Sequence, residues 1–147
     1  MAILSSLLKF VLLLSVALYQ LSWVDANSIV SPTAHQTLKP GQTLTVVVKR
    51  NSTDSAVKTL AFAVGLTVYP GSLGRPFLRT VEVEKGQAKW DSQHSTYSFE
   101  VTLPAAEGFI DQFSRPYTFG VSEYYLKGTS NVPALGMSNT PVTIKPN

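Results

Sequence analysis

A short and nearly unbroken apolar run, LAFAVGLTV at residues 60–68, constrains the fold of this chain more than any other stretch. It has one glycine inside it and is followed at once by Tyr69-Pro70-Gly71, which is a tight-turn sequence. A run of this length with such a stop is typical of a core strand, because a buried helix needs a longer apolar stretch. We therefore expect a strand at Leu60–Val68 that is buried on both faces.

The segments on either side alternate between apolar and polar residues, with the period of a half-buried strand. The clearest alternation places on one face Leu44, Val46 and Val48, then Tyr97, Phe99, Val101 and Leu103, then Tyr117, Phe119 and Val121. Further strands are expected at Ile29–Val30, Leu78–Glu84 and Val142–Ile144, and one short helical segment at Ala105–Phe113. About seven short strands separated by turn signals predict an all-β fold, an immunoglobulin-like antiparallel β-sandwich.

Residues 1–26 have the composition of a secretory signal peptide. Lys9 precedes an apolar run at Phe10–Leu18, and Val24-Asp25-Ala26 has the pattern of a cleavage site. The apolar run is too short to span a bilayer, which needs about 20 residues. We expect cleavage after Ala26, which leaves residues 27–147 as one secreted β-sandwich domain with no membrane association.

The charge and the cysteine content exclude several classes of function. The chain has 12 Lys and Arg against 9 Asp and Glu, and these charges are scattered without the basic stripe of a nucleic-acid-binding protein. It has no cysteine, so thiolate zinc sites and thiol nucleophiles are excluded. Asn51-Ser52-Thr53 is a glycosylation sequon between two expected strands, and Asn51 is the predicted acceptor. We expect a glycosylated monomer.

The two histidines offer little to a metal site. A copper-dependent oxidative polysaccharide enzyme, which is also a secreted β-sandwich, binds its metal through an N-terminal histidine. Here the predicted N terminus is Asn27, and His35 lies further along the chain. Asp91 and His94 stand three residues apart beside Trp90, but a metal or acid–base site needs more partners than these. We interpret them as solvated loop residues.

The remaining sequence shows no catalytic pattern. Glu82 and Glu84 share one face of an expected strand, which is the arrangement of a solvated face and not of two carboxylates across a cleft. No G-x-S-x-G elbow is present, and Gly71–Gly74 lacks the lysine of a phosphate-binding loop. We therefore expect no enzyme activity, no catalytic residue, no metal and no cofactor.

Several aromatic residues could instead contact a sugar or a protein partner. The candidates are Trp90, Tyr69, Tyr117, Tyr124 and Tyr125. Packing in the core is the alternative for each of them, and Tyr117 fits that alternative best because it belongs to an alternating strand. Trp90, Tyr124 and Tyr125 stand in or near expected loops, which favours a role at a surface.

Four further segments, together with the turn, resemble a known family. YPGSLG at residues 69–74 follows the apolar strand, as it does in the necrosis-inducing secreted effector proteins of fungi. Similar pieces occur in the same order at residues 38–46, 61–66, 97–105 and 138–144. The chain departs from the family pattern at Tyr124–Leu135, where the family has a glycine-rich segment, and at Arg75–Trp90, which is more charged.

The resemblance implies a secreted effector that suppresses plant immunity. Members of that family bind an immune co-receptor kinase and a receptor-like cytoplasmic kinase, inhibit them and suppress pattern-triggered immunity, and some induce cell death. The hypothesis that follows places partner binding at Tyr69, Pro70, Gly71, Ser72, Leu73, Gly74, Tyr124 and Tyr125. Entry into host cells stays open. The alternative is a cell-wall carbohydrate-binding module, and a secreted metalloenzyme is a more distant third.

Overall fold

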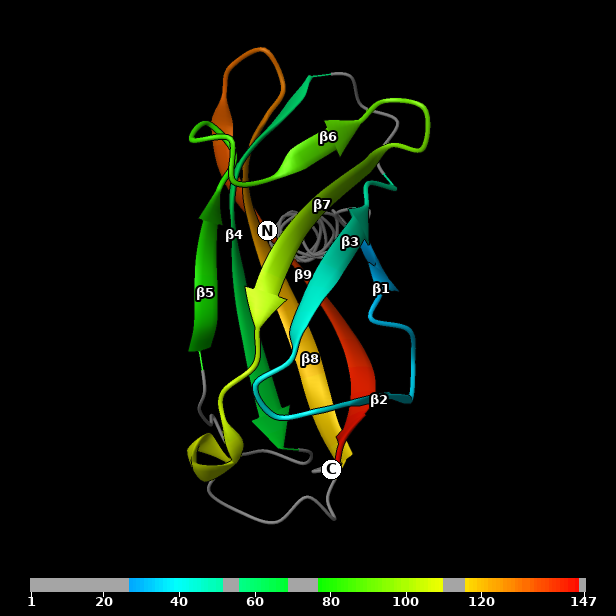
Figure 1. Cartoon of the computed structure of the whole chain (residues 1–147). Helices are drawn as coiled ribbons and strands as arrows, with labels where there is room; N and C mark the ends of the chain where they lie inside the picture. Colours follow the sequence, from blue (N-terminus) through cyan, green and yellow to red (C-terminus); the bar gives the residue numbers. More distant parts are fainter. Residues whose placement is uncertain (1–26, 52–55, 69–76, 110–115, 146–147) are drawn as a thin grey trace, which may run out of the picture.

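The computed structural model describes residues 27–51, 56–68, 77–109 and 116–145, and within them the chain forms two β-sheets packed face to face (Figure 1). The four-stranded sheet has the order β1 (Ser28–Ser31), β3 (Thr43–Lys49), β7 (Thr96–Thr102) and β6 (Lys89–Asp91). The five-stranded sheet has the order β2 (Gln36–Leu38), β9 (Val132–Ile144), β8 (Pro116–Lys127), β4 (Val57–Val68) and β5 (Phe77–Glu82). The predicted all-β sandwich is confirmed.

The pairing is antiparallel with one exception. β2 runs parallel to β9, with Gln36 opposite Val142 and Leu38 opposite Ile144. β2 and β6 are two short strands that the alternation of the sequence does not predict. The expected helical segment Ala105–Phe113 contains a single 3₁₀ turn, η1 (Ala106–Gly108), and its residues 110–113 lie outside the described residues.

The central apolar run is a strand with one buried face. Phe62, Val64 and Leu66 of β4 are at most 1% exposed, whereas Ala61 and Ala63 on the other side are half-buried. The expectation of a strand buried on both faces is therefore wrong. In a sandwich, each antiparallel sheet is covered on one side only. The apolar run is unbroken because the solvent side of β4 carries small alanines in place of polar residues, and not because both faces are buried.

The core lies between the two sheets and follows the alternation. Phe62 stacks on Phe99 with ring centroids 5.1 Å apart and meets Tyr97 edge-on at 5.3 Å, which joins β4 to β7 across the sandwich. The buried positions that the sequence predicted are confirmed for Leu44, Val46, Val48, Tyr97, Phe99, Val101, Leu103, Tyr117, Phe119 and Val121. Leu38, Val142 and Ile144 close the core beside β2.

The longest pairing is a hairpin of β8 and β9, which is longer than the sequence suggested. The final strand, expected at Val142–Ile144, begins at Val132, and the turn between the strands has Gly128 at φ 70° and Asn131 at φ 50°. β9 contains Pro133 and Pro141, which usually argue against a strand. They are tolerated because, among the described strands, β9 is paired on its second side only over residues 142–144.

Some expectations fall outside the described part of the chain. These are the signal peptide at residues 1–26, the turn Tyr69–Gly74, and Ser52 and Thr53 of the sequon. Among the described residues, none forms a helix long and apolar enough to cross a membrane.

Candidate functional site

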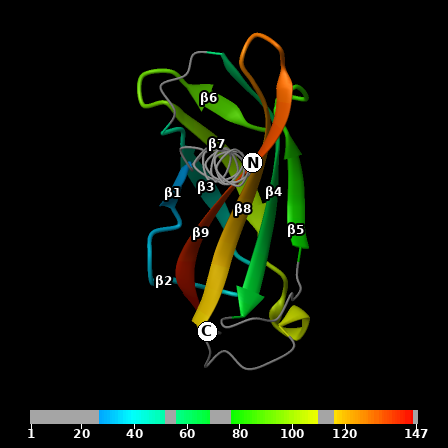
Figure 2. The same cartoon turned by 180° about the vertical axis from the view of Figure 1, so that it is seen from behind.

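The three longest strands of the five-stranded sheet, β4, β8 and β9, lie side by side (Figure 2), and we consider the residues on their solvent side. We call this side the outer face and define it by residues that alternate with the buried positions of β4, β8 and β9. The register aligns them in four rows, which are Ala61, Tyr124 and Leu135; Ala63, Ser122 and Met137; Gly65, Gly120 and Asn139; and Thr67, Thr118 and Pro141. None of these side chains carries a charge, and the nearest charged residues in the register lie at the borders of the face, with Glu82 of β5 opposite Ala61 and Lys58 of β4 opposite Leu126.

Large apolar side chains stand at one side of the outer face. Tyr124 is 55% exposed, Leu135 is 48% exposed and Met137 is 61% exposed. Beside them, β4 contributes only Ala61 and Ala63 in the same rows, so the surface drops from a ridge on β8 and β9 to a low strip on β4. An exposed apolar patch of this kind is typical of a protein-interaction surface.

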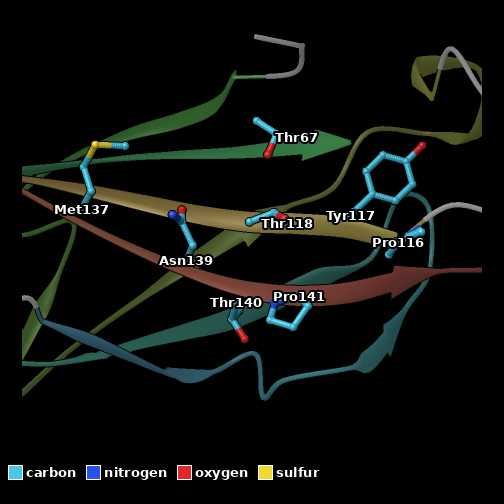
Figure 3. A pocket seen from close by; sticks show the side chains of 8 residues that line it. All are labelled: Thr67, Pro116, Tyr117, Thr118, Met137, Asn139, Thr140 and Pro141. Carbon is cyan, nitrogen blue, oxygen red and sulfur yellow. The ribbon is translucent and has the colours of Figure 1, made fainter. Parts of the chain in front are cut away.

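A hollow of about 590 Å³ continues the outer face toward the C-terminal end of β4 (Figure 3). Thr67 of β4, Thr118 of β8 and Asn139 of β9 line it, together with Met137 and Pro141. Its lining is mostly apolar. The polar groups in it are hydroxyls and one amide, and none of them is charged. The hollow offers a place for an apolar side chain of a partner, with hydrogen-bonding groups at its rim.

Gly120 shapes the middle of this surface. A Cβ atom placed on Gly120 would lie 3.0 Å from the side-chain oxygen of Asn139, which is closer than nearly all real contacts. The absence of a side chain lets the Asn139 amide lie across β8. The asparagine thereby separates the apolar ridge around Met137 from the row that contains Pro141.

The predicted partner-binding residues fall into three groups. Tyr124 lies on the outer face, as its proposed role requires. Tyr125 does not: it is 5% exposed, because the alternation of β8 turns it into the sandwich, where its ring lies 3.6 Å from a Cβ built on Gly136. The expectation that Tyr125 is at the surface is therefore wrong. Residues 69–74 lie outside the described residues, and their role stays a prediction.

Met137 is a surface residue that sequence reasoning did not identify as a candidate, and Leu135 was included only as the end of the segment Tyr124–Leu135 that was expected to help form the partner surface. The signal was present, since Leu135, Met137 and Asn139 alternate with Gly136 and Ser138. It was missed because the buried side of β9 in this region carries Gly136 and Ser138 and not large apolar residues. The usual pattern is thus inverted, with the apolar side chains facing the solvent.

Trp90 lies on the other sheet. It is 43% exposed on β6 and packs against Tyr97 with ring centroids 4.6 Å apart, and the guanidinium of Arg50 lies 5.0 Å from its ring. Within the described part of the chain, Trp90 and Tyr124 are the exposed large aromatic side chains, and they occupy different sheets. A flat row of aromatics on one face, which a carbohydrate-binding module needs, is therefore not formed by these two.

Asp91 and Glu84 are exposed acids that each pair with a neighbouring side chain. His94 Nδ1 lies 2.6 Å from Asp91 Oδ2, and this hydrogen bond, with further ones from backbone N–H groups, holds the pKa of Asp91 below its ordinary value. Lys58 pairs with Glu84 at 2.8 Å and lowers the pKa of Glu84. Among the described residues, no three His, Cys, Asp or Glu side chains come together as a metal site requires.

Glu82 and Asn51 are also at the surface. Glu82 pairs with Lys85 at 2.8 Å, as expected for the solvated side of an edge strand. Asn51 is exposed directly after β3, a position that a glycosylating enzyme can reach. A second hollow, of about 470 Å³, lies over the four-stranded sheet and is polar, with Arg79, Lys89 and Glu100 in its lining.

Comparison with known proteins gives a family but no curated relative, since no curated protein matches the chain. Similar solved structures include the superoxide reductase (neelaredoxin) from Ignicoccus hospitalis and a substituted form of it. Each is 11% identical, with a TM-score of 0.46 over 82% of this chain and 80% of that chain. The Nis1 family (necrosis-inducing secreted protein 1) matches residues 26–143, and membership of it indicates a necrosis-inducing secreted effector. The match includes every described strand but the last residue of β9, and the chain belongs to the Nis1 family.

Proposed function

We propose that this protein is a secreted fungal effector that binds plant immune kinases, inhibits them and thereby suppresses pattern-triggered immunity. Membership of the Nis1 family supports the effector role. The kinase partners follow from the resemblance described above, and are an immune co-receptor kinase and a receptor-like cytoplasmic kinase. Inhibition proceeds by occlusion: the domain covers part of the kinase and transforms nothing.

The observation that carries the proposal is the outer face. Its exposed Tyr124, Leu135 and Met137 form an apolar ridge without charge, on two of the three longest described strands, β8 and β9. A ridge on paired strands keeps its shape, so a partner that binds it loses little freedom to order it. Methionine adapts to irregular surfaces, which suits binding to two related kinases.

The first test is binding and inhibition with purified components. The domain from Asn27 to Asn147 is titrated into the kinase domain of each proposed partner while autophosphorylation is followed. Because occlusion consumes one domain for each kinase, inhibition should saturate near equimolar protein. Full kinase activity at a large excess of the domain would contradict the proposal.

The same preparation distinguishes the alternative class of function. Retention of the domain on chitin or β-glucan, together with no kinase binding, would replace the proposal with a carbohydrate-binding module. A matched pair of variants then separates the two candidate surfaces. Tyr124→Ala tests the outer face and Tyr69→Ala tests the turn at residues 69–74, and we expect the larger loss of kinase binding from Tyr124→Ala.

A further inference from the structure

The sandwich contains a buried carboxylate that the proposed function does not use. Glu123 of β8 is 4% exposed, on the inner side of the sheet. The Thr59 hydroxyl donates a hydrogen bond to Glu123 Oε1 at 2.5 Å, and the Asn27 side-chain amide donates one to Oε2. Both donors are neutral, and a buried carboxylate held only by neutral groups is costly.

The nearest described cation, Arg50, connects to this carboxylate through the Thr59 hydroxyl. Arg50 donates hydrogen bonds to the Thr59 hydroxyl, to the Tyr97 hydroxyl at 3.4 Å and to the Val57 carbonyl at 3.3 Å. It also stacks on two aromatic rings, which hold it on the far side of Thr59. Its attraction for Glu123 is weaker than the effect of burial, which raises the pKa of that carboxyl above the ordinary value.

Asn27 is fixed beside Glu123 by three contacts. Its amide nitrogen donates to Glu123, its backbone carbonyl accepts from the Ser138 hydroxyl, and its side-chain oxygen accepts from the Asn51 backbone N–H at 3.3 Å. The α-nitrogen of Asn27 is four bonds from the amide nitrogen. Standard bond lengths therefore keep it within about 8 Å of the carboxylate oxygen.

We propose that Asn27 is the first residue of the exported protein and that its α-ammonium group is the charge partner of Glu123. While residues 1–26 are attached, the nitrogen of Asn27 belongs to a neutral peptide bond. Cleavage after Ala26 converts it into an amine that is protonated at neutral and lower pH. At a separation of at most about 8 Å, in a partly buried site where water screens charges less than in bulk solution, the two groups attract each other.

The consequence is that processing stabilises the domain. Removal of the leader completes the polar cluster of the buried Thr59 and Glu123 with the partly buried Asn27 and Arg50, and the unprocessed chain lacks that contribution. This inference does not depend on kinase binding, because it concerns the folding of the domain alone. All the described strands lie after Asn27, so a chain that begins there keeps both sheets.

The test compares chains that differ only at the α-nitrogen. The domain is prepared with a free amine at Asn27, with an acetylated amine at Asn27, and with Ala26 added, and thermal unfolding is followed for each. We expect acetylation to lower Tm by about 5 °C and the added residue to lower it by less, because an ammonium group remains one residue away. Equal Tm values for the free and acetylated chains would overturn the proposal.

A second pair of chains assigns the effect to Glu123. In the Glu123→Gln variant, acetylation should leave Tm unchanged, whereas in the control variant Glu107→Gln the full difference should persist, since Glu107 is an exposed acid in η1. If Glu123→Gln fails to fold, the titration of the Asn27 amine followed by NMR in the unmodified domain decides instead. A pKa above the ordinary range of about 7.7–8.0 supports the pairing, and a pKa within that range contradicts it.

Discussion

Among single residues, Phe62 contributes most clearly to stability. It is fully buried in β4 and contacts Phe99 and Tyr97 of β7, so its ring packs the two sheets against each other. We expect Phe62→Ala to lower the free energy of unfolding by about 3–5 kcal/mol, because it removes buried area and leaves a cavity. Urea unfolding measures this, with Tyr124→Ala as the exposed aromatic control. A loss below about 1 kcal/mol for Phe62→Ala would contradict the packing described.

Glu123 gives a pH prediction at the same scale. Burial raises its folded pKa above the unfolded value of about 4.3, so its contribution to stability is present below that pH and is lost as pH rises through the folded pKa. In the chain acetylated at Asn27, stability relative to Glu123→Gln should therefore decline as the pH rises above about 4.3 and through the raised pKa of Glu123. The charged and titratable groups around Glu123 are Arg50, which donates to the Thr59 hydroxyl, and Tyr125, whose pKa is raised by burial and by the Glu123 charge.

The free α-amine should reduce this decline, because an ammonium group favours the ionised carboxylate. Denaturant unfolding of the four chains, with and without acetylation and with Glu or Gln at 123, measures the difference at each pH. An identical pH dependence in all four would show that Glu123 has the same proton affinity in the folded and unfolded chains.

At the scale of elements, the hairpin of β8 and β9 depends on its turn. Gly128 has φ 70°, where a side chain costs about 1–2 kcal/mol, and nothing else in the described chain lies within 4 Å of a Cβ placed there. Gly128→Ala should lower the free energy of unfolding by roughly that backbone cost. Asn131→Gly is the matched control, because Asn131 also has a positive φ and glycine tolerates it. Equal effects of the two variants would contradict the turn geometry.

The elements also show what the sequence could predict. Where apolar residues alternate on the buried side, as in β3, β7 and the first half of β8, strand and facing were correct. The predicted last strand is shorter than β9, because prolines and a glycine interrupt the apolar alternation. A sheet accommodates those residues only where the strand lies at its edge, and the sequence does not reveal that edge. Tyr124 and Tyr125 were both expected at the surface, whereas the extension of β8 to Lys127 places one on each side of the sheet.

For the whole molecule, the arrangement of two sheets separates the core from the proposed binding surface. The core between the sheets is continuous, and the outer face of the five-stranded sheet contributes nothing to it. Substitutions of its exposed residues Tyr124, Leu135 and Met137 should therefore change the free energy of unfolding by less than about 0.5 kcal/mol. The sequence predicted a binding protein of this family, but the face itself required the pairing of β4, β8 and β9, since its residues come from three separate segments.

The most direct test of the account is a charge placed on that face. Met137→Glu is compared with Val30→Glu, which puts the same charge on an exposed apolar residue of β1 in the other sheet. Calorimetric titration against the immune kinase domain should show binding at least ten-fold weaker for Met137→Glu and unchanged for Val30→Glu, with both variants as stable as the parent. Equal affinity of Met137→Glu and the parent protein would contradict docking through the outer face.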